Sequence, residues 1–83
     1  FGADIINCSW GTYNVSQSVK EKIVDLATNG RNGKGGIIVF ASGNENREFL
    51  DTSLEGLDGI ITVGATDYHG SRAYYSNYGN NLD

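Results

Sequence analysis

The sequence predicts an α/β fold, specifically a fragment of a doubly wound and mostly parallel sheet, and three observations support this prediction. Three short apolar runs, at residues 4–8, 36–41 and 59–65, lack the polar alternation of half-exposed strands and are typical of parallel strands covered on both faces. A helical pattern separates the first two runs. Parallel strands joined by a helix usually lie side by side with a right-handed crossover, so the expected order is strand, helix, strand, loop, strand.

The helix between the first two strands has both a start and a stop signal. Residues 18–21 (Ser-Val-Lys-Glu) have the form of a capping box, in which the Ser hydroxyl and the Glu carboxylate each bond a free backbone N–H of the first turn. Asn29-Gly30 supplies the stop. Between these signals one face is apolar at helical spacing, which predicts an amphipathic helix. The apolar face consists of Val19, Ile23, Leu26 and Ala27.

The rest of the chain carries weaker patterns. Residues 45–58 form a polar loop without a sustained helical period, and residues 66–83 predict turns around a short extended stretch at 73–76. No repeat or linker divides the chain, so residues 1–83 are interpreted as part of a single domain. One helix cannot cover both faces of three strands, and we therefore expect further chain, or a partner, to complete the fold.

Composition and charge narrow the function classes. The 83 residues include ten acidic and six basic side chains, for a formal net charge of −4, so no nucleic-acid partner is expected. No apolar segment is long enough for a signal peptide or a membrane span, and no membrane partner is expected. Cys8, the single cysteine, lies in an apolar run and is interpreted as a small buried hydrophobe.

The most informative segments follow the first two predicted strands. The tail Ser9-Trp10-Gly11 follows the first strand, and Ser42-Gly43-Asn44 follows the second. Open α/β sheets bind ligands beyond the carboxyl ends of their strands, and neighbouring parallel strands place both tails at one edge. Trp10 offers apolar surface there and Asn44 a neutral N–H donor, which fits a peptide cleft. The residues alone leave a second interpretation open, in which Gly-Asn is an ordinary turn and Trp10 belongs to the core.

Four sequence motifs follow one another along the chain in a recognisable order and spacing. The most specific is Val-Phe-Ala-Ser-Gly-Asn at residues 39–44. The others are Ile-Ile-Asn-Cys-Ser-Trp-Gly at 5–11, Ile-Ile-Thr-Val-Gly-Ala-Thr at 60–66 and Tyr-Ser-Asn-Tyr-Gly at 75–79. Together they resemble the subtilase family of serine peptidases (subtilisin and kexin, peptidase S8) over nearly the whole chain. The resemblance implies a subtilisin-like fold and makes residues 1–83 an internal part of a single peptidase domain.

The resemblance also implies roles for individual residues. Asn44 matches the family's side-chain donor of the oxyanion hole, the group that donates an amide N–H to the oxygen of the tetrahedral intermediate. The tail of the first strand matches the segment whose backbone pairs with the substrate peptide. The end of the second strand matches the opposite wall of the primary specificity pocket. The substrate-binding residues implied in this way are Ser9, Trp10, Gly11, Ala41, Ser42 and Gly43.

The family's catalytic triad of Asp, His and Ser does not occur in family context in this chain. Its motifs are expected before Phe1 and after Asp83. We therefore expect the parent protein to be a subtilisin-like serine endopeptidase to which this chain, inactive alone, supplies the oxyanion-hole Asn and the substrate-binding walls. Asp67 and His69 are not expected to form a local triad with Ser71 or Ser76, because neighbours two residues apart on a turn rarely converge on one hydroxyl.

The resemblance further implies partners and location. The expected partners are a peptide or protein substrate and the remainder of the peptidase domain, and the expected location is secreted or extracellular. Kexin-like members carry acidic residues after the Trp-Gly and near the Tyr-Ser, but this chain has Thr12-Tyr13-Asn14 and Ser76-Asn77 there, so dibasic specificity is not supported. A weaker hypothesis concerns Glu45, which would place a negative charge near the pocket rim and mildly favour basic substrate residues.

No metal site or cofactor is expected in this segment. Asp51, Glu55 and Asp58 share one loop and are interpreted as solvated surface charges, because calcium needs six to eight oxygen ligands. By family resemblance, calcium is expected only in the parent protein.

Two alternative functions stay open. The first is a non-catalytic α/β binding module that uses the glycine-rich residues 30–36, although phosphate loops follow a strand and this stretch precedes one, which favours a helix exit. The second is an inactivated subtilase-like domain, because the triad residues lie outside this sequence.

Overall fold

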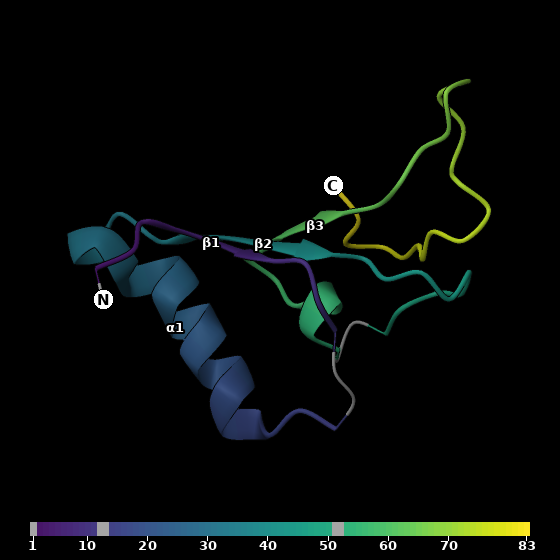
Figure 1. The fold of residues 1–83 in the computed structure, drawn as a ribbon. Coiled ribbons are helices and arrows are strands. Elements are labelled where there is room, and N and C mark those ends of the chain that lie inside the picture. Colours follow the sequence, from purple (N-terminus) through teal and green to yellow (C-terminus); the bar gives the residue numbers. More distant parts are fainter. Residues whose placement is uncertain (1, 12–13, 51–52) are drawn as a thin grey trace.

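The computed structural model describes residues 2–11, 14–50 and 53–83. It contains a three-stranded parallel sheet with the strand order β1-β2-β3, one long helix and one short 3₁₀ helix (Figure 1). The strand, helix, strand, loop, strand order is therefore confirmed. The elements are β1 (Ile5–Cys8), α1 (Gln17–Gly33), β2 (Ile37–Ala41), η1 (Leu54–Gly56) and β3 (Ile61–Val63).

One face of the sheet forms the core. In register, Cys8 lies beside Phe40 and Phe40 beside Thr62, and all three side chains are buried. In Figure 1 the sheet is seen nearly edge-on, with α1 and η1 below it on this face. Because side chains alternate between the two faces of a strand, every second residue of β2 points into this core. The buried cluster is Cys8, Ile38, Phe40, Leu54 and Ile60, with Val15, Ile23, Leu26, Ala27 and Leu57 packed against it.

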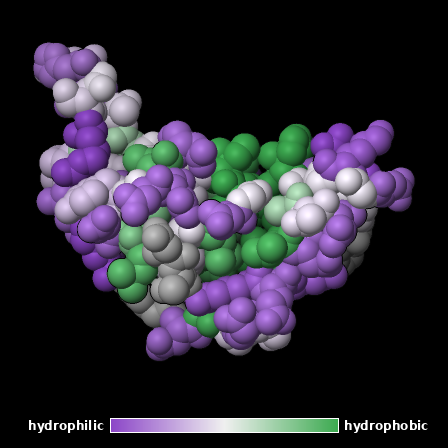
Figure 2. Space-filling view, turned by 180° about the vertical axis from the view of Figure 1, so that it is seen from behind, coloured by the Kyte–Doolittle hydropathy of each residue, from purple (hydrophilic) through white to green (hydrophobic). Residues whose placement is uncertain are grey.

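The opposite face of the sheet is apolar and largely exposed. Ile5 and Ile37 are paired there at 62% and 37% exposure, and Ile61 and Val63 extend the patch to β3. Figure 2, which is turned about the vertical axis of Figure 1 and so again views the sheet along its edge, shows hydrophobic residues gathered across the middle of the molecule between hydrophilic ends. Large apolar patches on a folded chain normally mark a surface that something else covers. The expectation that further chain or a partner completes the fold stays a prediction.

The start of α1 differs from the predicted capping box. Ser16 is the N-cap and makes no side-chain cap bond; instead its carbonyl accepts the Val19 and Lys20 N–H groups at 3.2 and 3.3 Å. The Ser18 hydroxyl lies 3.1 Å from the Ser16 hydroxyl. The helix therefore begins at Gln17, ahead of the predicted box, because the Ser16 carbonyl closes the first turn; Glu21 lies exposed on the helix.

The end of α1 confirms the predicted stop. Gly30 leaves the helical conformation, and Arg31 and Asn32 adopt left-handed backbone angles, with φ of 54° and 58°. The Gly35 N–H then bonds the Gly30 carbonyl, and the Gly36 N–H bonds the Leu26 carbonyl, each at 2.8 Å. The glycine-rich stretch is thus a helix exit that leads straight into β2, as its position in the sequence indicated.

Two loop predictions were incomplete or wrong. The loop at 45–58 contains η1, which is too short to leave a helical period in the sequence. Residues 73–76 form a turn, not an extended stretch, because the Ser76 N–H bonds the Ala73 carbonyl at 2.9 Å. This turn brings the residues after it alongside the segment that follows β2, where Tyr78 and Glu48 form a parallel bridge. Within the described ranges, no helix is long and apolar enough to cross a membrane.

Candidate functional site

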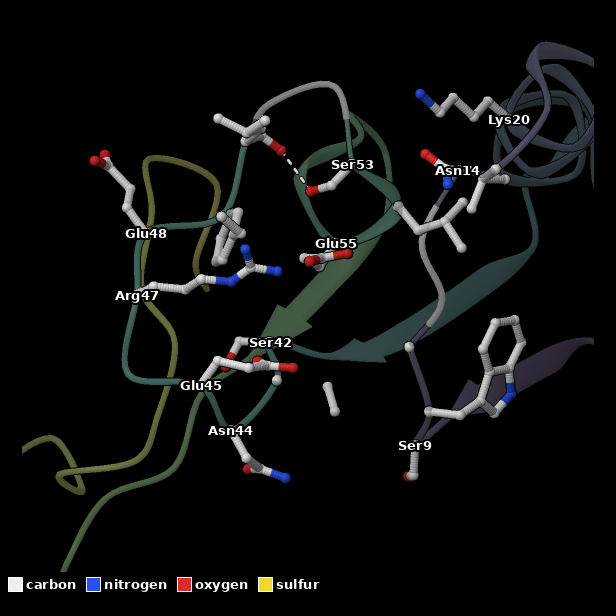
Figure 3. A pocket seen from close by; sticks show the side chains of 18 residues that line it. Ser9, Asn14, Lys20, Ser42, Asn44, Glu45, Arg47, Glu48, Ser53 and Glu55 are labelled. Atoms are coloured by element: carbon white, nitrogen blue, oxygen red, sulfur yellow. Dashed lines mark hydrogen bonds between the residues drawn. The ribbon is translucent and has the colours of Figure 1, made fainter.

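A pocket of about 530 Å³ lies at the carboxyl ends of β1 and β2 (Figure 3). The structure brings all the predicted site residues to it: the tail of β1 forms one side and the end of β2 the other. η1 and the segment before it contribute further apolar and charged side chains. The predicted residues that line the pocket are Ser9, Trp10, Gly11, Ala41, Ser42, Gly43 and Asn44.

The tail of β1 is an open side of the pocket. Trp10 stands edge-on to the buried Phe40 ring, with ring centroids 5.6 Å apart and planes at 75°, yet 55% of Trp10 is exposed. It therefore rests on the core and presents surface to the pocket, which combines the two interpretations that the sequence left open. The Ser9 hydroxyl accepts a hydrogen bond from the Asn7 amide at 2.9 Å. A Cβ on Gly11 would meet no atom within 4 Å.

The tail of β2 is tightly held. The Ser42 N–H bonds the Val63 carbonyl at 2.9 Å, which continues the sheet by one residue. The Ser42 hydroxyl is buried and donates to the Asn77 carbonyl at 3.3 Å, so it is engaged within the protein. Gly43 has a φ of +100°, and a Cβ there would overlap the Asn77 amide and the Glu45 carboxylate. Glycine is therefore required at position 43 by both backbone angle and space.

Asn44 is the exposed residue at the end of this held tail. Figure 3 shows Asn44 and Ser9 projecting on the same side of the pocket from neighbouring strands. Within residues 2–11, 14–50 and 53–83, no hydrogen bond engages the Asn44 side chain. A neutral amide on a rigid turn, with its N–H groups unengaged, can donate to an oxygen on a ligand.

The charged side chains of the pocket have mixed signs. In Figure 3 Glu45, Arg47 and Glu55 project toward its interior, whereas Glu48 points outward. One Glu45 carboxylate oxygen accepts a hydrogen bond from the Asn77 amide at 2.6 Å. Glu45 is exposed at the rim of the pocket, and the bond from the Asn77 amide fixes the position of its carboxylate.

Asn77 is a buried residue beside the pocket whose contacts sequence reasoning missed. It is 2% exposed, and its side chain makes four hydrogen bonds to residues 42–47. From the sequence, residues 76 and 77 were considered for their place in a family motif and for lacking a carboxylate, and Asn77 stands 30 to 35 residues from these partners in sequence. The available signal was its place inside the Tyr-Ser-Asn-Tyr-Gly motif.

Several other predicted features take simple structural roles. Burial raises the pKa of the Cys8 thiol, which fits a small buried hydrophobe. The Asp67 carboxylate accepts the backbone N–H groups of His69 and Ser71 at 2.8 and 3.1 Å, so it stabilises an exposed turn and does not orient the imidazole.

The loop considered for calcium is only partly described. Asp51 lies outside the described residues, and the Asp58 carboxylate lies 3.4 Å from the Asn81 amide nitrogen. Among the residues that the structure describes, no group of three or more Asp, Glu, His or Cys side chains is arranged to hold a metal ion. Thr12 and Tyr13, named above in connection with dibasic specificity, also lie outside the described residues.

A family profile described as "Subtilase family" matches residues 1–83, which is the whole chain. The chain belongs to the subtilase family. The "Dibasic-processing endoprotease" of Yarrowia lipolytica (strain CLIB 122 / E 150) is 40% identical over an alignment of 83 positions that covers 88% of this chain and 8% of the relative. The "Calcium-dependent protease" of Trichormus variabilis (strain ATCC 29413 / PCC 7937) is 35% identical over an alignment of 94 positions that covers 94% of this chain and 14% of the relative.

Two further comparisons extend this picture. The "Extracellular basic protease" of Dichelobacter nodosus is 35% identical over 77 residues, covering 93% of this chain and 12% of the relative. A solved structure of a protease from Pseudoalteromonas arctica PAMC 21717 is 33% identical, with a TM-score of 0.73 over 98% of this chain and 23% of that chain. The subtilase segment therefore spans about 8% to 14% of the length of these curated relatives.

Proposed function

We propose that this chain is an internal part of a subtilisin-like serine endopeptidase domain, a domain that hydrolyses peptide bonds. In this proposal Asn44 donates its amide N–H to the oxygen of the tetrahedral intermediate. The observation that carries the proposal is the exposed, unengaged Asn44 amide at the rim of a pocket that both strand tails line. A preorganised neutral donor stabilises the developing oxyanion more than the ground-state carbonyl, and so accelerates acyl transfer.

The two tails have complementary roles in the proposal. The backbone of Ser9, Trp10 and Gly11 pairs with the extended substrate, which gives affinity without strong sequence preference. Ala41, Ser42 and Gly43 form the facing wall of the pocket for the side chain before the scissile bond. The open space at Gly11 supports a close approach by the substrate backbone.

The substrate of the parent enzyme is a peptide or protein, and the remainder of the peptidase domain is the partner that completes the site. Dibasic specificity is not part of the proposal, because Ser76 and Asn77 are buried and uncharged. The extracellular relative supports secretion of the parent protein. Calcium is proposed for the parent only, on the strength of the calcium-dependent relative, since the described residues form no such site and no catalytic step is assigned to it.

The test is an Asn44→Ala variant of the complete enzyme, with Asn80→Ala as a matched control at an exposed asparagine outside the pocket. Removing one such donor in a subtilisin lowers kcat by about 100- to 1,000-fold, and we expect a loss of that order with KM within about twofold. An unchanged kcat would remove Asn44 from the mechanism.

The alternative of an inactivated domain makes a different prediction. In that case the complete protein hydrolyses no peptide, and Asn44→Ala has no activity to lower. The isolated 83-residue chain is expected to be inactive under either alternative. Hydrolysis by the pure chain that a serine-directed inhibitor blocks would contradict the proposal that the triad comes from elsewhere in the protein.

A further inference from the structure

We infer that Asn77 is a positioning residue for the oxyanion donor: its buried amide holds the turn that presents Asn44. The inference rests on the proposed function of Asn44 and adds a second residue, distant in sequence, on which that function depends. Asn77 does not contact the pocket, so its effect on a reaction would pass through the turn alone.

The Asn77 side chain uses all of its hydrogen-bonding capacity on this turn. Its oxygen accepts the N–H groups of Glu45 and Arg47 at 2.9 and 3.1 Å. Its nitrogen donates to the Ser42 carbonyl at 2.9 Å and to the Glu45 carboxylate at 2.6 Å. A primary amide offers two acceptor sites and two donors, so a serine or an aspartate at position 77 cannot reproduce the set.

The orientation of the Asn77 amide follows from the same contacts. The opposite orientation would point its NH₂ group at two backbone N–H donors and its oxygen at a carbonyl and a carboxylate. Four repulsive contacts would replace four hydrogen bonds, and the group is almost wholly buried. The amide therefore has one stable orientation, which is what a fixed template for a turn requires.

The bonds of Asn77 flank Asn44 on both sides. The Asn77 backbone N–H bonds the Gly43 carbonyl at 3.0 Å, and its side chain holds the Glu45 N–H. The residues immediately before and after Asn44 are thus tied to one residue, while Asn44 itself stays exposed. A catalytic donor must be held within about 0.5 Å of its productive position, and bonds at the two neighbouring residues supply that restraint.

Further hydrogen bonds between backbone atoms and from Arg72 reinforce the same turn. The Asn46 N–H bonds the Tyr75 carbonyl at 2.9 Å, and the Tyr78 N–H bonds the Arg47 carbonyl at 3.1 Å. From outside, one Arg72 guanidinium nitrogen donates to the Asn46 side-chain oxygen at 3.0 Å and to the Ser76 carbonyl at 2.5 Å. Asn77 therefore holds the turn from within and Arg72 clamps it from the surface.

The experiment measures Asn77→Asp in the complete enzyme, once with Asn44 present and once in an Asn44→Ala background. The aspartate keeps both acceptor bonds but turns a carboxylate oxygen toward the Glu45 carboxylate and the Ser42 carbonyl. We expect kcat to fall about 10- to 100-fold with Asn44 present, with KM within about twofold. In the Asn44→Ala background the same change should lower kcat less than about threefold, because the donor that it displaces is already gone.

The control is Asn80→Asp, which makes the same substitution at an exposed position three residues along the chain. It should leave kcat unchanged in both backgrounds. An equal loss from Asn77→Asp in both backgrounds would show a general structural role and overturn the inference while leaving Asn44 as donor. If Asn44→Ala alone leaves kcat unchanged, the proposed function fails first, so the two failures are distinct.

A second variant keeps the inference testable if Asn77→Asp does not fold. Arg72→Gln removes the outer clamp at an exposed position, so folded enzyme is expected. It should lower kcat severalfold with Asn44 present and have no effect in the Asn44→Ala background. Equal losses in the two backgrounds, or none in either, would contradict the positioning of the turn by the 72–77 segment.

Discussion

The two strand tails that face each other across the pocket differ sharply in how they are held. The tail of β1 has a side-chain bond between Asn7 and Ser9 and an edge-on aromatic contact under Trp10. The tail of β2 is bonded to β3 and to Asn77 at almost every residue around Asn44. The tail proposed to stabilise charge is therefore rigid, whereas the tail proposed to pair with substrate keeps its backbone accessible.

Alanine substitutions at the two tail glycines, Gly43 and Gly11, are expected to show the largest difference between the tails. Gly43→Ala forces a side chain into a left-handed backbone and into the Asn77 amide, so it should destabilise the enzyme by about 1–3 kcal/mol and largely abolish turnover. Gly11→Ala meets open space and should change the free energy of unfolding by less than about 0.5 kcal/mol.

Thermal unfolding and steady-state kinetics of these two variants check that contrast. Gly11→Ala is expected to act on substrate binding, with a rise in KM of about threefold to tenfold and little change in kcat. Equal stability losses at the two glycines would contradict the proposed difference between the tails.

Trp10→Ala should have an intermediate effect. The substitution removes an aromatic contact with Phe40 that is worth about 0.5–1.5 kcal/mol and exposes part of the core. It also removes apolar surface from the pocket, so we expect KM to rise more than kcat falls. Trp10→Phe, assayed beside it, should recover most of the stability. If Trp10→Ala lowered kcat without raising KM, Trp10 would act in the chemical step, which would contradict the proposed difference between the two tails.

Glu45→Gln should give the smallest effect. Its charge lies at an exposed rim, where an ion pair with substrate contributes about 0.2–1 kcal/mol. The preference for Lys over Phe before the scissile bond should therefore fall by about fivefold at most in kcat/KM. The amide can still accept the bond from Asn77, so unfolding should change little. An unchanged preference would remove Glu45 from substrate selection.

The sequence predicted those parts of the molecule that depend on local patterns. Continuous apolar runs rich in β-branched residues marked all three strands, and the parallel topology then placed Ser9 and Asn44 at one pocket. The start of α1 was predicted too late, because two serines compete for the cap and only the backbone of Ser16 decides between them. The turn at 73–76 was missed because its closing bond is made by backbone atoms.

The role of Asn77 could not be derived from local patterns. Its four side-chain bonds exist only after the fold places residue 77 under residues 42–47, and nothing near it in sequence specifies that contact. The need for glycine at position 43 has the same origin in part, since a side chain there would overlap the Asn77 amide as well as the Glu45 carboxylate. Contacts between distant segments set the most constrained part of the site.

The most direct test of Asn44 as an oxyanion donor compares two inhibitors of the complete enzyme. A peptide boronate forms a tetrahedral adduct that needs the donor, whereas a peptide of the same sequence that lacks the C-terminal carboxylate occupies the cleft without placing an oxygen at the donor. We predict that Asn44→Ala weakens boronate binding by about the same factor as kcat/KM falls and leaves peptide binding unchanged. Equal weakening of both inhibitors, or of neither, would contradict the account.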